Sequence, residues 1–403
     1  MPEQNTVSGS GEIATVRRAH ALRQSLKAAR RQIFTPGAIR IWFIVGLVLA
    51  LFLNIGMGAV EASPRQIITV IFSRTWNILE PTVIAPPLAA VGNQLLRVDW
   101  IADAVSWVQV DVTRQVESVV WSIRLPRTLM AGIIGAGLAV SGASMQGLFR
   151  NPLADPGLIG VSTGASLGAI LAIVSGFSIF GLWSIPSAAF VGAVITTAVV
   201  YIIARHGGRT EVVTLLLAGI ALNAIIGAAI GMMMTIANDS QLRSITFWTL
   251  GSLGGSRWSQ VGIVLVATIV GTIICRRSAQ ALNLLALGER EAKHLGIEVE
   301  RMRLVLIVAV AMMVGSGVAF SGSIGFVGLL VPHLIRLLIG PDHRVLLPMA
   351  TIAGAMLLLF ADLVSRTIAQ PAEIPIGVTI SLVGGPFFLW LLVRMRSRQG
   401  GWG

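Results

Sequence analysis

The chain has 403 residues, of which 55% are hydrophobic and only 12% are charged, and its formal net charge is +12. Soluble domains carry about 25% charged residues, so this composition and the mean hydropathy of +0.82 exclude a water-soluble protein. They predict an all-α polytopic membrane protein. The single cysteine, Cys275, excludes an internal disulfide, a cysteine-rich zinc site and a CxxCH haem attachment.

The first 40 residues are polar and basic. They do not show the apolar core and cleavage site of a secretory signal. We therefore expect residues 1–40 to form a retained cytoplasmic tail. Most of the 30 lysines and arginines fall beside apolar segments on the side of this tail, as the positive-inside rule requires. We therefore interpret the basic charge as a determinant of membrane topology, and we expect no nucleic-acid partner.

Ten segments approach the length of about 20 apolar residues that a bilayer-spanning helix needs. They lie near residues 41–60, 126–148, 157–177, 182–204, 212–236, 259–275, 304–320, 322–339, 345–366 and 375–394. An even number of spans places both termini in the cytoplasm. We predict a ten-helix transmembrane domain over 41–396, which includes an extended periplasmic segment at 62–123, and a cytoplasmic tail at 397–403.

The second span begins in the stretch "RLPRTLMAGIIGAGLAVSGASMQGLFRNPLADPG", residues 124–157. Small residues recur there at every fourth position and share one helix face, where a second helix can approach closely. These residues are Ala131, Gly135, Ala139, Ala143 and Gly147. Ser141, Ser144 and Gln146 lie on other faces. Two roles are open for them: lining a polar passage or bonding to neighbouring helices.

The sequence lacks the motifs of an energy-converting enzyme. Neither of its two lysines, Lys27 and Lys293, follows a glycine loop, so a Walker A site for ATP is absent. HExxH, the motif of zinc metalloproteases, is absent as well. The predicted spans are almost free of acids, which argues against an ion-coupled carrier. The exception is Asp362, which lies four residues before Arg366 and predicts an ion pair on one helix face.

The longest internal loop, residues 281–303, predicts two short amphipathic helices broken at Gly288. Such an element lies on the membrane or docks in a groove of a soluble partner, and the pattern does not choose between them. On the outer side, Arg124, Arg127 and Arg366 lie at helix ends, where arginines commonly anchor a helix. Glu373, just before Pro375, predicts a cap for the last span.

Several long motifs follow one another in the order of a known family. These are the stretch from 124 extended to "LIGVSTGAS", then "LALGEREAKHLGI", "GSIGFVGLLVPHLIRLLIGPDHRVLLP" and "EIPIGVTISLVGGPFF". From about residue 120 to 395 the chain resembles the FecCD-type permease subunits of ABC importers for haem, ferric siderophores and cobalamin. The resemblance implies a type II ABC importer permease with ten helices per chain, in the bacterial inner membrane.

The resemblance also implies partners. It implies a homodimer with the pathway on its twofold axis, two separate ABC ATPase subunits that bind ATP and Mg²⁺, and a periplasmic substrate-binding protein. The chain would then be no enzyme and would bind no cofactor or metal of its own. Haem is the favoured cargo, with ferric siderophore and cobalamin as alternatives. A passive channel or a binding-only membrane protein is the alternative from another class.

Two sets of residues take roles from the resemblance. The outer arginines Arg124, Arg127 and Arg366 would meet carboxylates of the binding protein. The glycine-split loop would form coupling helices in clefts of the ATPases, through Leu287, Gly288, Glu289, Ala292, Leu295 and Gly296.

Overall fold

The computed structural model describes residues 36–58, 60, 62–79 and 111–398. Most of the predicted tail at 1–40, the middle of the predicted periplasmic segment and residues 399–403 lie outside the described residues. The chain divides into two compact units, residues 1–46 and 47–403. In the first unit the described part is the beginning of helix α2 (Pro36–Gly56). All contacts given below lie within the second unit.

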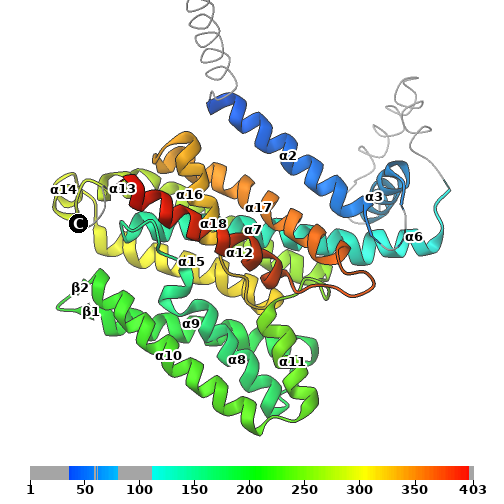
Figure 1. Cartoon of the computed structure of the whole chain (residues 1–403), viewed down its shortest axis with the longest axis horizontal. Coiled ribbons are helices and arrows are strands. Elements are labelled where there is room, and N and C mark those ends of the chain that lie inside the picture. The colour runs from blue at the N-terminus through cyan, green and yellow to red at the C-terminus, as the bar shows by residue number, and fades with distance from the viewer. Residues whose placement is uncertain (1–35, 59, 61, 80–110, 399–403) are drawn as a thin grey trace, which may run out of the picture. The chain divides into compact units, whose positions relative to one another are not determined.

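The described part of the second unit is almost entirely helical (Figure 1). After the end of α2, its elements are α3 (Pro64–Leu79), α6 (Arg114–Ser118), the π-helical turn η1 (Val119–Arg124), α7 (Leu125–Leu148), η2 (Pro156–Ile159), α8 (Val161–Ser175), η3 (Gly181–Trp183), α9 (Ser184–Ala204), β1 (Arg205–His206), β2 (Arg209–Thr210), α10 (Val212–Ile236), α11 (Asp239–Leu250), α12 (Trp258–Arg277), α13 (Ala279–Leu285), α14 (Glu289–His294), α15 (Val299–Ser321), α16 (Val327–Ile339), α17 (His343–Thr367) and α18 (Ile376–Arg398).

The all-α membrane fold is confirmed. Among the described residues, seven helices are long and apolar enough to cross a membrane. Three further apolar helices, within α8, α16 and α18, are shorter. These segments fall where the ten spans were predicted, but length and composition support seven of them, so the count of ten stays a prediction. The predicted spans also omit α11, a polar helix that begins with a capping box between Asn238 and Gln241.

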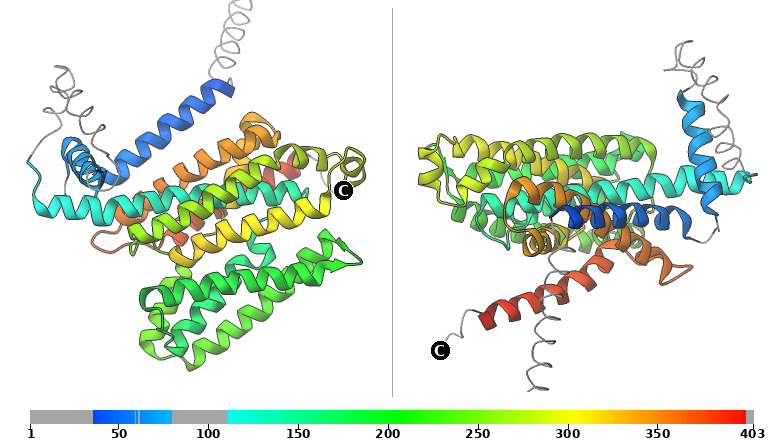
Figure 2. Two further views of the ribbon diagram at one scale, coloured as in Figure 1. Left: turned by 180° about the vertical axis from the view of Figure 1, so that it is seen from behind. Right: turned by 90° about the horizontal axis from the view of Figure 1, so that it is seen from above.

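Helix α7 is the centre of the main helical group. In the continuous helical run Arg114–Leu148, 83% of the most apolar window is buried, against 17% for α10. Helix α7 packs against α12, α15, α16 and α17, while α8, α9 and α10 pack mainly on one another and contact α15 through α8 and α9. Figure 2 shows these as two neighbouring groups of helices. Among the seven long apolar helices of the described residues, the one that begins at the RLPR stretch is therefore the most enclosed by protein.

Glycine lets α7 approach its neighbours backbone to backbone. The five small residues that were predicted to share a face are all buried. A Cβ atom at Gly135 would collide with the carbonyl oxygen of Gly354 on α17 and would lie 2.7 Å from the Cβ of Leu358. A Cβ at Gly142 would collide with the backbone of Gly328 on α16. Contacts this close exclude any larger side chain without movement of a whole helix.

We predict that Gly135→Ala destabilises the protein, because the added methyl group meets rigid backbone. Overpacking of this kind costs about 1–3 kcal/mol. Gly132→Ala, one turn earlier on the same helix, is the matched control, since the nearest atom to its Cβ would be the end of the Leu359 side chain at 4.0 Å. Thermal unfolding of the purified variants should show a lower melting temperature for Gly135→Ala alone. Equal melting temperatures would contradict the assigned packing.

Candidate docking site and coupling loop

The three arginines that were predicted to dock a partner lie together. Arg124 ends the π-helical turn η1, Arg127 lies in the first turn of α7, and Arg366 lies in the last turn of α17. With Glu373, from the loop between α17 and α18, they line a cavity of about 480 Å³. The fold thus brings side chains from early and late parts of the chain to one opening.

Arg127 is held by two carboxylates on different elements. Its Nε donates to Oδ1 of Asp362 on α17 at 2.9 Å, and its Nη1 donates to both carboxylate oxygens of Glu373 at 2.8 and 2.9 Å. The Arg127 side chain is 9% exposed, whereas that of Glu373 is 48% exposed. Asp362 therefore fixes the guanidinium from inside, and Glu373 covers it on the side that faces the cavity.

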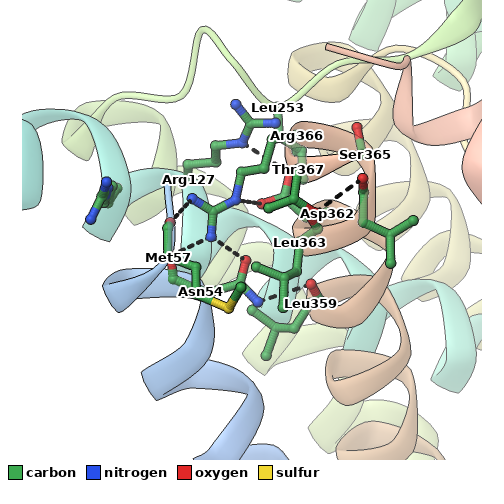
Figure 3. Close-up of polar contacts among 12 residues, drawn as sticks. Asn54, Met57, Arg127, Leu253, Leu359, Asp362, Leu363, Ser365, Arg366 and Thr367 are labelled. Carbon is green, nitrogen blue, oxygen red and sulfur yellow. Dashed lines mark hydrogen bonds and ion pairs between the residues drawn. The ribbon is translucent and has the colours of Figure 1, made fainter. Parts of the chain in front are cut away.

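Asp362 also forms the predicted ion pair with Arg366. The distance from Nε of Arg366 to Oδ2 of Asp362 is 3.6 Å, longer than a hydrogen bond. The shorter bond goes to Arg127, a partner that helix periodicity does not reveal. Asp362 is fully buried, and one buried carboxylate thus faces two guanidinium groups (Figure 3). The negative charge of Asp362 is thus compensated by its two arginine partners. Because three arginines and two carboxylates meet here, the cavity keeps a net positive charge.

Arg124 and Arg366 bind the end of α2. Arg124 donates through Nη1 to the carbonyl oxygens of Ile55 at 2.9 Å and Gly56 at 3.1 Å. Arg366 donates to the carbonyl oxygen of Met57 at 2.7 Å and to the main-chain and side-chain oxygens of Asn54. The last carbonyl groups of a helix have no partner within it and favour cations. Both arginines therefore cap α2 in addition to lining the cavity.

The structure corrects the prediction for Glu373. The acid was expected to cap the last span, but α18 begins at Ile376 with no acidic residue in its first turn. The Glu373 carboxylate binds Arg127 instead. The physical reason is that a full guanidinium charge with two donors attracts a carboxylate more strongly than the partial charge of a helix end.

The predicted pair of short helices in the internal loop is present as α13 and α14, separated at Gly288. Gly288 has φ +142°, and a Cβ there would collide with the Glu291 carboxylate. Around this break, Ala292 is fully buried, while Leu287 and Leu295 are 68% and 59% exposed. Gly296, with φ +85°, ends the second helix segment. The loop therefore exposes two leucines on either side of a short helix whose flanking glycines have positive φ.

The loop is fastened to α15 by charge. Glu289 bonds to Lys293 at 2.9 Å and forms an ion pair with Arg303 at 3.3 Å. Partial burial raises the pKa of Glu289, but the hydrogen bond from Lys293 and the charge of Arg303 outweigh it, so the pKa lies below its usual value. Arg303 is 1% exposed and also donates to Thr210 at the end of β2 at 2.7 Å. Movement of α14 is thereby linked to α15 and to the β1–β2 hairpin.

Among the described residues, no group of three or more histidine, cysteine, aspartate or glutamate side chains is placed to hold a metal ion. The structure instead combines a positive cavity at one end of α7 with a loop between α12 and α15 that bears two exposed leucines. Residues 46–394 match the FecCD transport family.

The chain belongs to this family. It is therefore a permease subunit of an ABC importer, a protein with several membrane spans in the bacterial inner membrane, and members of this family carry no ATPase site of their own.

The curated relatives are similar over most of their length. The chain is 48% identical to the hemin transport system permease protein HmuU of Yersinia pestis over 286 residues, 70% of this chain and 85% of the relative. It is 44% identical to the vitamin B12 import system permease protein BtuC of Klebsiella pneumoniae over 279 residues, 69% of this chain and 83% of the relative. A BtuC protein of Halobacterium salinarum is 41% identical over 70% of this chain and 76% of its own length.

A solved structure supports the fold. It is described as an inward-facing conformation of a metal-chelate type ABC transporter, is 31% identical, and gives a TM-score of 0.72. The match covers 88% of this chain and 99% of that one.

We predict that Asp362→Asn strongly destabilises the protein. It leaves Arg127 and Arg366 buried without the carboxylate that faces both, and removal of one partner of a buried ion pair typically costs about 3–5 kcal/mol. Glu373→Gln is the control. Its carboxylate is half exposed, and loss of such a pair costs less than about 1 kcal/mol. Thermal unfolding in detergent measures both, and similar melting temperatures for the two variants would contradict the central role of Asp362.

Proposed function

We propose that this chain is the permease of a haem importer. Its resemblance to the hemin permease, with 48% identity over 85% of that protein, is the observation that carries the choice of cargo. Cobalamin is one competing cargo, because the cobalamin permeases are only slightly less similar. Ferric siderophores, which the resemblance to the family implies, are the other. A passive channel is the alternative from another class.

The proposed assembly is a homodimer with two ABC ATPases, which bind ATP and Mg²⁺, and a periplasmic binding protein. Both termini would face the cytoplasm. Arg124, Arg127 and Arg366 would receive carboxylates of the binding protein, since guanidinium forks match carboxylates and set orientation. Cargo would then enter the dimer axis, and closure of the ATPases on ATP would tilt the helices between two access states. Leu287, Gly288, Glu289, Ala292, Leu295 and Gly296 would carry the coupling.

The test of this proposal is uptake into proteoliposomes. The permease would be reconstituted with its ATPase and binding protein and offered haem, cyanocobalamin or a ferric siderophore in parallel. We expect accumulation of haem that requires ATP and both partners. Preferred uptake of another chelate would replace haem by that cargo, and flux without the ATPase would establish the channel instead.

Neutralising Glu373 should strengthen docking. Because Asp362 still holds Nε of Arg127, Glu373→Gln leaves the Nη1 donor in place and available to a carboxylate of the binding protein. The binding free energy should improve by the strength of one partly exposed ion pair, about 0.2–1 kcal/mol. This corresponds to an increase in affinity of up to about fivefold. Arg366→Gln should weaken binding. Affinities of the reconstituted permease for the binding protein measure both, and weaker binding by Glu373→Gln would contradict the role of Arg127.

A bulky residue at Gly288 should uncouple ATP hydrolysis from uptake. Leucine there has to adopt a backbone conformation that only glycine favours and has to displace Glu291, so α13 and α14 lose their arrangement. Gly262→Leu on α12 is the control, because nothing lies within 4 Å of its added Cβ. The ratio of ATP hydrolysed to cargo accumulated should rise for Gly288→Leu alone. An unchanged ratio would count against this loop as the coupling element.

A further inference from the structure

A second cavity, of about 550 Å³, lies at the other end of α7. It is bounded by the end of that helix, by α13, and by the turn between α16 and α17. The charged side chains in its lining are Arg150, Arg336 and Asp342. The three arginines at the opposite end of α7, Arg124, Arg127 and Arg366, do not line this cavity. It is therefore a separate site.

Arg336 is held in the cavity wall by a neutral partner. Its Nη1 donates to Oε1 of Gln146 at 2.7 Å, and the Gln146 amide is oriented by a bond from Nε2 to the carbonyl oxygen of Gly328 at 3.3 Å. Gln146 thus bonds to one neighbouring helix, α16, and it also lines the cavity. Arg336 is half-buried and has no carboxylate partner among the described residues. Its remaining guanidinium donors are therefore available to a ligand.

Two further donors come from the turn after α7. Arg150 is exposed and forms no ion pair with any described residue. Its φ of +50° gives the backbone a left-handed turn directly after α7. The side-chain oxygen of Asn151 accepts from the backbone N–H of Leu153 at 2.9 Å. This bond orients the side-chain amide of Asn151. Its NH₂ group has no partner among the described residues and can donate to a ligand.

The carboxylate of Asp342 does not compensate these charges, because it is already bound. It accepts from Arg344 at 2.9 Å and from Asn283 at 2.6 Å. The hydrogen bonds from the Arg344 side chain and backbone and from Asn283 hold the pKa of Asp342 far below its usual value. The cavity therefore keeps an excess of positive charge and of hydrogen-bond donors.

We propose that this cavity binds a phosphate group through Arg336, Arg150 and Asn151. Arginine presents a planar fork of donors that matches two oxygens of a phosphate. The next two residues of α16, Leu337 and Leu338, do not line the cavity, but they are 57% and 46% exposed and give the same helix an apolar surface for acyl chains. Basic pockets between membrane helices bind anionic lipid head groups in this way. A phospholipid and free phosphate share the recognised chemistry, and the experiment separates them.

The full-length protein, purified in detergent and stripped of lipid, would be titrated with phosphatidylglycerol and, separately, with inorganic phosphate. Native mass spectrometry counts bound lipid, and thermal unfolding measures stabilisation by either probe. We expect Arg336→Gln to weaken phosphatidylglycerol binding about tenfold, as loss of charge-assisted hydrogen bonds implies. Arg150→Asn, which tolerates the left-handed backbone, should weaken it less. Arg277→Gln, an exposed arginine at the end of α12, is the charge-matched control and should change nothing.

If Arg336→Gln does not fold, Arg336→Lys keeps the charge without the fork and should bind with intermediate affinity. Displacement of the lipid by inorganic phosphate would identify free phosphate as a sufficient ligand, and no displacement would identify the lipid; both results support a phosphate site. Equal binding of both probes by the wild type and the Arg336 variants would overturn it. So would loss of ATPase binding in Arg336→Gln with unchanged lipid binding, which would assign the arginine to a protein carboxylate.

Discussion

The buried carboxylate of Asp362 is the interaction on which the arginine-bearing end of this permease depends. Two arginine side chains, each only 9% exposed, face it from α7 and α17. Without it, their charges would lie in a low-dielectric region with only neutral oxygens and the half-exposed Glu373 as partners, and burial of uncompensated charge is strongly unfavourable. One of them, Arg366, in turn donates to the main-chain oxygens of Asn54 and Met57 at the end of α2. A single carboxylate thus joins three helices that are far apart in the sequence.

This network explains how the same arginines serve the fold and the proposed docking of a partner. Asp362 holds Arg127 through Nε, which leaves the Nη atoms directed to the cavity, where Glu373 now binds. A carboxylate of a binding protein would compete with Glu373 rather than with Asp362, because only Glu373 is substantially exposed. The arginine would therefore keep its orientation while its outer partner is exchanged. Orientation before contact reduces the entropic cost of docking.

Local patterns in the sequence predicted most of the long helices of this structure, though not the polar helix α11. The fifth predicted span, 212–236, coincides with α10, because a long apolar run has few alternatives in a membrane. The break at Gly288 between two short helices was also predictable, since glycine and a charged turn interrupt an apolar pattern. The bond between Arg127 and Asp362 was not, because the residues are 235 positions apart and no periodicity relates them. Polar contacts between distant helices require the packing to be known first.

Helix α7 connects the two charged cavities, and its packing decides how a change at one end reaches the other. At Gly135 and Gly142 its backbone lies directly against the backbones of α17 and α16. Flexible side chains do not separate these helices there, so no side-chain rearrangement can absorb a relative shift. Close-packed contacts of this kind favour a few discrete arrangements over continuous deformation. In an alternating-access cycle α7, α16 and α17 would accordingly move as one body. Release of a binding protein at the arginine cavity and a shift of α13 at the cavity beside Arg336 would then be coupled, because the same group of helices carries both.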